Sequence, residues 1–456
     1  MRAVTKSALV IAALLALSAI ALPQQPPGEK PIWVDHDMKS IPEPKEHETG
    51  FGYDFINGTV FQQIKQAFDF PRTARIIAGK RKEAYNVNSV GGVPDSSWFT
   101  NRNGRRPMSL EEIRRGPDED AGPSGSVLTI TRGKTQGFTP GFWIKDSRGD
   151  TYIIKFDPPR YLELASAAEV IATKLFYAIG YSVPQNTIFY LRPEQLQIAP
   201  DAKFTDKSGV KRRMTQADLE AILGMVARRA DGSYRAVASK LLQGTKGGFH
   251  FLGVRRDDPN DIIPHEHRRD LRALRVFCAW LEHNDIRAAN TLDRYVSENG
   301  RSFIRHYLID FGSALGSETF FPNPPRVGHS HIVDWEDAGK VLLTAGIYQP
   351  SWTYGKKFRY PSVGLYSAED FNPQQWKQNF PLVAFENMTQ ADAAWAAEIV
   401  GSFTDEQIRA AVETGQLSDR DAAEYLASQI IARRDKIVQA YLGGRAQRQA
   451  AAAERK

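Results

Sequence analysis

Cysteine is almost absent from this chain of 456 residues, which has only Cys278. A single thiol excludes any intramolecular disulfide, so stability must come from packing. Cys278 lies in an apolar segment, residues 271–281, beside Phe277 and Trp280. A lone cysteine in such a segment is more often a core residue than a nucleophile.

Long apolar runs are also missing. The longest, residues 8–22, has about fifteen residues, which is too short for a comfortable membrane span. Arg2 and Lys6 precede this run, and Ala19-Ile20-Ala21 fits a cleavage site. We therefore expect residues 1–21 to be a signal peptide, the protein to be exported to a periplasmic or extracellular location, and no stable transmembrane anchor to remain.

Neither basic nor acidic residues strongly predominate in the chain. The chain has 59 basic and 53 acidic residues and a net charge of +6, and the basic residues form no single stripe. A nucleic-acid-binding protein gathers its basic side chains on one face, so we expect no nucleic-acid partner. The mild positive balance suits an anionic ligand such as a nucleotide. Hydrophobic residues at 42% and charged residues at 25% are typical of a globular protein.

Composition divides the chain into successive parts. Residues 22–124 are a loop-rich extension with many aromatic residues, which we expect to pack on the main domain. Residues 125–262 are β-rich and contain an insert, and residues 263–444 are mainly helical. The Gln- and Ala-rich tail, residues 445–456, is predicted to be disordered. Within the extension, residues 93–102 (VPDSSWFTNR) predict a capped turn with a docked aromatic pair.

The β-rich part has a recognisable order of elements. Alternation and turn residues predict strand, glycine-bearing loop, strand, strand, helix and strand. The helix ends at Gly180, a residue suited to a helix C-terminus. The predicted elements are strands 126–131, 142–146, 151–156 and 186–191, the helix 163–179, then a helix 215–228, a strand-like run 234–242 and a helix 266–281.

Lys155 stands at the end of an apolar strand. A lysine there needs an anion, because burying an unpaired ammonium is expensive. Glu169, fourteen residues later, lies on a helix beside small alanines that leave room for a carboxylate. A lysine that reaches nucleotide phosphates while paired with a helix glutamate would fit this pattern. Glu163 is a competing partner, and a lysine that simply reaches water remains the alternative.

The loop between Gly133 and Gly141 could lie over the phosphates. Backbone N–H groups around Gly133 and Gly137 could form an anion-binding concavity. The loop matches neither a Walker A motif, because Leu128 stands where a glycine is needed, nor G-x-G-x-x-G. A plain glycine-bearing hairpin is the alternative interpretation.

The clearest motif is HNDIRAAN at residues 283–290, followed by Asp310-Phe311-Gly312. An H-x-D-x-x-x-x-N loop followed by D-F-G is the pattern of phosphoryl transfer, in which Asp285 would act as acid/base and Asn290 and Asp310 would hold Mg²⁺. Arg287 could neutralise the transferring group. Ordinary turn formation by Asp285 and Asn290 is the alternative.

Histidines offer no metal site by sequence. The pairs at 265 and 267 and at 329 and 331 lack cysteines and a spaced third ligand, so we interpret them as solvated loop residues. His283 is expected to brace its loop rather than to act as a base.

Together, Lys155, Glu169, Asp285, Asn290 and Asp310 resemble the protein-kinase-like superfamily, and its atypical HipA-type and phosphoinositide-kinase-like branch in particular. The resemblance covers residues 125–320, about half of the chain. It implies a two-lobed α+β fold, in which residues 125–262 form a small β-rich N-lobe with one key helix, hinge and insert, and residues 263–444 a helical C-lobe. It also implies ATP and Mg²⁺ as cofactors.

The function that follows is transfer of the ATP γ-phosphoryl group to an acceptor that could be protein, lipid or sugar. No A-P-E motif follows Asp310, which puts ordinary protein-substrate docking in doubt. Two alternatives stay open: a catalytically inactive kinase-fold scaffold, and nucleotidyl transfer from the same site.

Overall fold

The structure is a computed structural model that describes residues 36–47, 78, 81–134, 141–206, 208–353 and 357–453. The predicted signal peptide and residues 48–77 of the extension therefore lie outside the described residues. None of the described helices is long and apolar enough to cross a membrane.

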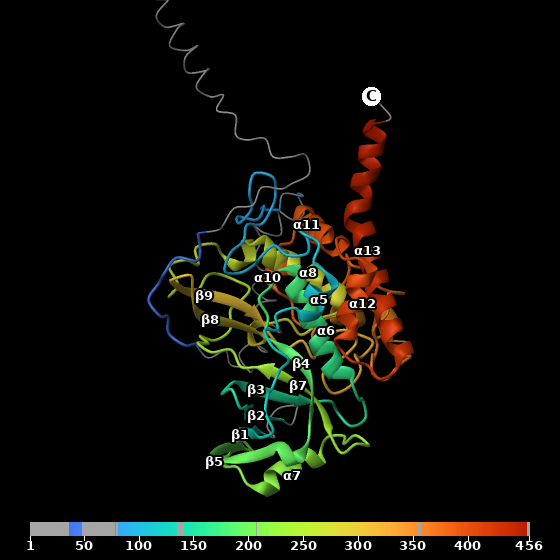
Figure 1. Ribbon diagram of the computed structural model, residues 1–456. Helices are drawn as coiled ribbons and strands as arrows, with labels where there is room; N and C mark the ends of the chain where they lie inside the picture. The colour runs from blue at the N-terminus through green and yellow to red at the C-terminus, as the bar shows by residue number, and fades with distance from the viewer. Residues whose placement is uncertain are drawn as a thin grey trace, which may run out of the picture.

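A mixed sheet forms one end of the molecule, and helices gather at the other end (Figure 1). Its strand order is β4-β7-β3-β2-β1-β5-β6, and neighbours are antiparallel except for the parallel pair β1 and β5. The strands are β1 (Leu128–Lys134), β2 (Gly141–Lys145), β3 (Thr151–Phe156), β4 (Asn186–Leu191), β5 (Leu196–Thr205), β6 (Lys211–Arg213) and β7 (Tyr234–Lys240).

The two faces of this sheet have different surroundings. Alternate residues of β3, such as Ile154, point into an apolar core that also contains Leu219 and Ile222 of α7 (Gln216–Gly224). Because side chains alternate along a strand, Ile153 and Lys155 point to the opposite face. There they line a small pocket instead of the core.

Helix α6 (Leu164–Ile179) connects the sheet to the helical part. It contacts β3, β4 and β7 on one side and α5 (Leu110–Arg115) and α12 (Asp405–Glu413) on the other. It ends at Gly180, as the sequence predicts. There φ is 144°, and a Cβ would lie 2.3 Å from the Phe99 ring. Only glycine fits this close approach without strain.

The helical part surrounds a second and larger core. Cys278 is buried at its centre, as predicted, together with Phe277 and Trp280. Helix α12 begins with a capping box at Thr404. The elements are α8 (Arg269–Leu281), the hairpin β8 (Thr291–Glu298) and β9 (Arg301–Leu308), α9 (Trp335–Leu343), α10 (Val383–Glu386), α11 (Gln390–Gly401) and α13 (Arg420–Ala453), with short 3-10 turns at Pro193–Gln195, His265–His267, Ala288–Asn290 and Ser351–Thr353.

Two sequence expectations are wrong here. The tail predicted to be disordered from residue 445 is helical as far as Ala453, because α13 runs through Gly443 and Gly444. The alanines, glutamines and arginines on both sides are strong helix formers that outweigh two glycines. His265, interpreted as a solvated residue, is buried and bonds the Asp261 carboxylate at 2.7 Å.

Residues 81–124 of the extension pack on the rest of the chain. Trp98 and Phe99 are buried, and the Ser96 hydroxyl accepts hydrogen bonds from both of their backbone N–H groups. The Trp98 ring stacks on His306 of β9 with 3.4 Å between centroids. The extension is therefore integral to the larger core, and the molecule is an α+β protein with a β-rich and a helical part.

Candidate active site

Lys155 and Glu169 are a direct pair. The Lys155 ammonium at the end of β3 lies 3.2 Å from Glu169 Oε2 on α6. The other Glu169 oxygen accepts a hydrogen bond from the Asn186 amide at 3.1 Å. Glu163, the competing partner, is instead bonded by the backbone N–H of Ser418. The packing of α6 across the sheet thus decides between the two carboxylates.

Asp310 completes a triad of charges. Its Oδ1 lies 2.8 Å from the Lys155 ammonium, so the lysine is held between two carboxylates. The backbone at Asp310 has φ of 63°, a left-handed conformation that is uncommon for a residue other than glycine. Strain of this kind persists where the surrounding structure enforces it, and it is frequent at functional sites.

Gly312 lets the two acidic side chains come together. A Cβ at this position would lie 3.3 Å from Glu169 Oε2 and 3.4 Å from the Thr319 hydroxyl. Both contacts are tight, so a larger residue would press on the carboxylate that holds Lys155. The small residue of the Asp-Phe-Gly motif therefore has a packing role here.

The loop 283–290 begins where α8 ends. Glu282 adopts a left-handed cap with φ of 52°, which turns the chain out of the helix. Arg287 Nε lies 3.1 Å from Asp285 Oδ1, and the Asn290 amide donates to Asp285 Oδ2 at 2.9 Å. The Ile309 N–H donates to the Asn290 carbonyl at 3.0 Å, which brings this loop beside Asp310.

His283 holds the start of the loop against the segment around Phe311 and Ser313. It is fully buried, its Nδ1 lies 3.3 Å from the Ser313 carbonyl, and its ring is 5.2 Å from that of Phe311. Burial lowers its pKa to about 4, so the ring is neutral at physiological pH. This geometry fits the bracing role that the sequence predicts.

The charged groups of the site shift one another's pKa values. Burial alone would lower the pKa of Lys155, but Asp310 and Glu169 outweigh it and raise that pKa. The Lys155 charge in turn lowers the pKa of Asp310. Burial raises the pKa of Asp285 to about 6, although Arg287 opposes the shift. The site thus combines a fixed cation, an ionised carboxylate and a carboxyl that titrates near neutrality.

Asp310 and Asn290 fit a magnesium ion. No three His, Cys, Asp or Glu side chains converge on a possible metal position within the described residues. Mg²⁺ does not need such a cluster, because it keeps several waters and binds one or two protein oxygens together with substrate phosphates. Asn290 uses its amide nitrogen for Asp285, which leaves the amide oxygen as the donor for an ion.

A small pocket lies beside the ion pairs of Lys155. It has a volume of about 120 Å³ and is lined by Lys155, Glu169, Asp310 and Thr319, with Trp143 and Val237 among its apolar walls. Thr319 was not anticipated from the sequence, and neither was Glu318, whose charge acts on Asp285. No motif marks either residue. Both lie in the segment after Gly312, whose course depends on tertiary packing.

The glycine loop is smaller than predicted. Gly133 is part of β1, paired with Phe142, and a Cβ there would meet the Met214 side chain on the core face of the sheet. The prediction that Gly133 belongs to the loop is therefore wrong, because β1 and β2 extend further than their patterns indicate. Gly137 lies outside the described residues.

Comparisons with known proteins give only distant similarity. No protein-family model matches the sequence, and no curated protein matches it. Among solved structures, the chain is similar to the Helicobacter pylori proinflammatory kinase CtkA, with 13% identity and a TM-score of 0.33 over 66% of this chain and 90% of that one. It is also similar to the Golgi casein kinase, with 9% identity and a TM-score of 0.26 over 82% and 95% of the two chains.

A structure of the same Golgi kinase with Mn and ADP bound has 9% identity, a TM-score of 0.24 and the same coverage. TM-scores this low carry no argument about the site. The α+β class that the sequence predicts is confirmed, with a seven-stranded sheet and a helical part. What the site can do follows from its own residues.

Proposed function

We propose that this protein is a kinase-like phosphotransferase that moves the γ-phosphoryl group of ATP to an acceptor hydroxyl. The observation that supports it best is Lys155 held between Glu169 and Asp310, at 3.2 and 2.8 Å, beside the Asp285 loop. Lys155, Glu169 and Asp310, drawn from 155 residues of chain, line one pocket, and the Asn290 carbonyl accepts a hydrogen bond from Ile309 next to it, an arrangement that phosphoryl transfer could use.

Each residue has a role in this proposal. Lys155 binds the nucleotide phosphates, and Glu169 holds it in place. Asp310 and Asn290 would hold Mg²⁺, which when bound neutralises phosphate charge. Asp285 orients the acceptor hydroxyl and accepts its proton as the new oxygen–phosphorus bond forms and the bond to ADP breaks. Arg287, at 3.1 Å from Asp285, offsets the negative charge that develops.

The direct ion pair between Lys155 and Asp310 implies an exchange of partners. A lysine that contacts phosphate and an aspartate that contacts a cation have less need of each other. We propose that nucleotide and cation binding therefore opens the 2.8 Å contact while the buried contact to Glu169 stays. Nucleotide and cation should accordingly bind better together than apart.

Transfer itself is the test of this proposal. ATP labelled in the γ-phosphoryl group, incubated with the full chain, Mg²⁺ and separate protein, lipid and glycan fractions, should label an acceptor. Asp285→Asn should reduce labelling by about 10²–10⁴-fold, the usual contribution of a catalytic base. Asp201→Asn, an exposed carboxylate on β5, is the matched control and should leave transfer unchanged.

The alternatives give different outcomes in the same assay. Label that appears only from α-labelled ATP would indicate nucleotidyl transfer. No label from either nucleotide, with nucleotide binding intact, would indicate a catalytically inactive scaffold. Membership of the HipA-type or phosphoinositide-kinase-like branch is part of this proposal, and it rests on the five motif residues.

Export is a separate proposal. It rests on Arg2 and Lys6 before the apolar run 8–22 and on the small residues that end it. Expression of the full chain followed by fractionation and N-terminal sequencing should find a mature protein that begins near residue 22. Full-length protein in the cytoplasmic fraction would contradict export.

A further inference from the structure

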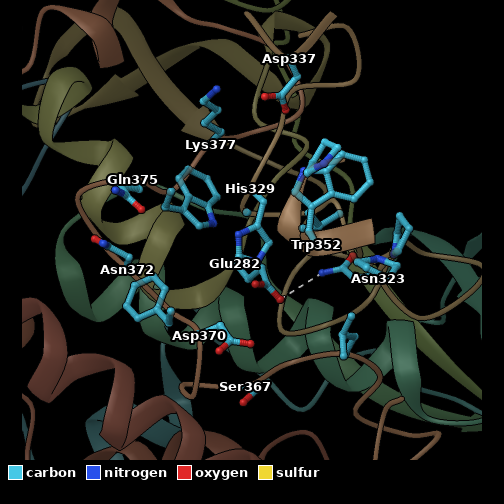
Figure 2. Close-up of a pocket in the computed structure, with 18 of the residues that line it drawn as sticks. Glu282, Asn323, His329, Asp337, Trp352, Ser367, Asp370, Asn372, Gln375 and Lys377 are labelled. Atoms are coloured by element: carbon cyan, nitrogen blue, oxygen red, sulfur yellow. Dashed lines mark hydrogen bonds between the residues drawn. The ribbon is translucent and has the colours of Figure 1, made fainter. Parts of the chain in front are cut away.

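A second cavity, larger than the one around Lys155, lies elsewhere in the described part of the chain. It has a volume of about 820 Å³ and lies in the helical part, between α8, α9 and the segment 365–377. Figure 2 shows Gln375 and Asn372 on one side of it, Trp352 and Asn323 on the other, and Glu282 and His329 between them. This volume is within the range of small-molecule sites.

The basic side chains of the cavity wall already have partners. Lys340 lies 2.6 Å from Glu336, Lys377 lies 2.7 Å from Asp334, and Arg433 lies 3.0 Å from Glu282. Arg275, the fourth, donates to backbone carbonyls, one of them that of Trp376 at 2.7 Å. The wall thus has no surplus of cations for an anionic ligand such as a nucleotide.

The acidic side chains are similarly engaged. Glu282 and Glu336 belong to the ion pairs above, and Asp337 accepts a hydrogen bond from the Tyr348 hydroxyl at 3.2 Å. Asp370 is the fourth acid, at the exposed rim. With four acids and four bases largely neutralising one another, the lining favours an uncharged ligand.

The remaining lining combines aromatic rings with amide groups. Trp352, Trp376, Tyr348 and Phe371 supply flat apolar surface, and they alternate with side-chain amides that both donate and accept hydrogen bonds. A molecule with apolar ring faces and many hydroxyls uses both kinds of surface. The amides are Asn323, Asn372, Gln374 and Gln375.

One donor in this wall lacks a partner. Trp376 is only 2% exposed, and its indole N–H finds no acceptor among the described residues. A buried donor left without an acceptor is costly, so native proteins rarely keep one without a reason.

The cavity is also connected to the catalytic loop. The Asn323 amide donates to Glu282 at 3.2 Å, and its oxygen accepts from the Asn284 amide at 3.3 Å. Asn284 also donates to Glu318 at 3.2 Å and directly precedes Asp285. A ligand in the cavity therefore lies one layer of polar side chains away from the proposed active site.

We propose that this cavity is a second ligand site, which binds a neutral, polyhydroxylated molecule of the glycan class through Trp352, Trp376 and the surrounding amides. It is lined by none of the residues of the Lys155 pocket. The site is independent of the proposed phosphoryl transfer, and its occupation needs neither nucleotide nor metal.

The test is calorimetric titration of the full chain, without nucleotide, with four neutral probes: maltotriose, cellotriose, xylotriose and tri-N-acetylchitotriose. At least one should bind saturably with a Kd of about 1 mM or below. Trp352→Ala and Asn372→Ala, on the partly exposed wall, should each weaken that binding at least about tenfold, the equivalent of 1.4 kcal/mol. Trp335→Ala is the matched control, because Trp335 is exposed on α9 outside the cavity, and it should bind as the unaltered protein does.

Three results would overturn the proposal. The first is that none of the four sugars binds saturably. The second is binding that Trp352→Ala and Asn372→Ala leave unchanged. The third is a preference for an uncharged Ser/Gly tetrapeptide over every sugar, which would make the cavity a peptide site. Because these titrations contain no ATP, their failure would leave the proposed transferase activity untouched, and the reverse also holds.

Discussion

Asp285 shows how one residue can serve function at the expense of stability. Burial raises its pKa to about 6 from a usual 3.8, so the folded protein prefers the protonated form. Its favourable contribution to stability is therefore present below the unfolded pKa and is lost as pH rises through about 6. At neutral pH, where a base must be ionised, this carboxylate destabilises the fold.

Asp285→Asn should consequently stabilise the protein while reducing transfer by about 10²–10⁴-fold. A shift of about two pKa units corresponds to at most about 3 kcal/mol in the free energy of unfolding, expected at pH 7.5 and absent at pH 3.5. Urea unfolding at both pH values measures it. A loss of stability at pH 7.5 would mean that Asp285 is a structural residue.

The same pKa predicts how transfer depends on pH. If Asp285 accepts the acceptor proton, kcat/KM should fall tenfold per pH unit below about 6 and level off above it. Initial rates between pH 4.5 and 8 give this profile. A rate independent of pH over that range would assign the proton to another group.

Lys155 should contribute to stability as well as to nucleotide binding, and the contribution to stability can be measured alone. In Lys155→Met the Glu169 and Asp310 carboxylates face each other without a cation, which should cost about 3 kcal/mol of unfolding free energy. Lys203→Met, on an exposed strand position, is the control and should change stability by less than about 0.5 kcal/mol. Chemical unfolding compares the two, and equal effects would contradict a stabilising role for the Lys155 ion pairs.

The residues of this site could largely be anticipated from the sequence, because phosphoryl transfer ties residue types to fixed spacings. Asp285, Asn290 and Asp310 stand in such a pattern, and Lys155 is conspicuous at the end of an apolar strand. Thr319 and Glu318 could not be anticipated. Their positions depend on how the chain folds after Gly312, where Thr319 adopts φ of 67°.

Among the elements, α6 carries the strictest local requirement. Gly180→Ala would place a methyl group 2.3 Å from the Phe99 ring and 2.7 Å from the Thr100 carbonyl, at φ of 144°. We expect a loss of about 2–4 kcal/mol in unfolding free energy, because overpacking and backbone strain add. Movement of α6 would also shift Glu169.

Gly224→Ala is the matched control. Gly224 ends α7, has nothing within 4 Å of its Cβ position and is not among the residues of positive φ. Alanine is a better helix former, so this change should be neutral or stabilise by up to about 1 kcal/mol. Chemical unfolding of the two variants tests the pair. A Gly180→Ala protein as stable as Gly224→Ala would refute the close approach.

Elements were predictable where pattern and capping agree. The helix ending at Gly180 follows its signals. Strand β5 was missed because most of its residues are exposed or half-buried, and its parallel partner β1 is distant in sequence. Helix α13 extends beyond its predicted end because the residues on both sides of Gly443 and Gly444 favour helix.

At the scale of the whole molecule, the extension 81–124 is part of the fold. Trp98 packs against His306, Phe249 and Arg268, all from the main domain. Trp98→Ala should therefore cost about 3–5 kcal/mol, as for other buried aromatic residues. Thermal unfolding should show one lowered transition. Loss of a separate minor transition instead would mean that the extension folds as its own unit.

The central claim is that Lys155 and Asp310 form a nucleotide site that requires Mg²⁺. Thermal melting of the full chain with ATP, with and without Mg²⁺, tests it most directly. At about 100 times its Kd the nucleotide should stabilise the protein by ~2.7 kcal/mol only when Mg²⁺ is present. Asp310→Ala should lose this gain and Asp285→Asn should keep it. No stabilisation with ATP and Mg²⁺, or an equal gain in Asp310→Ala, would contradict the account.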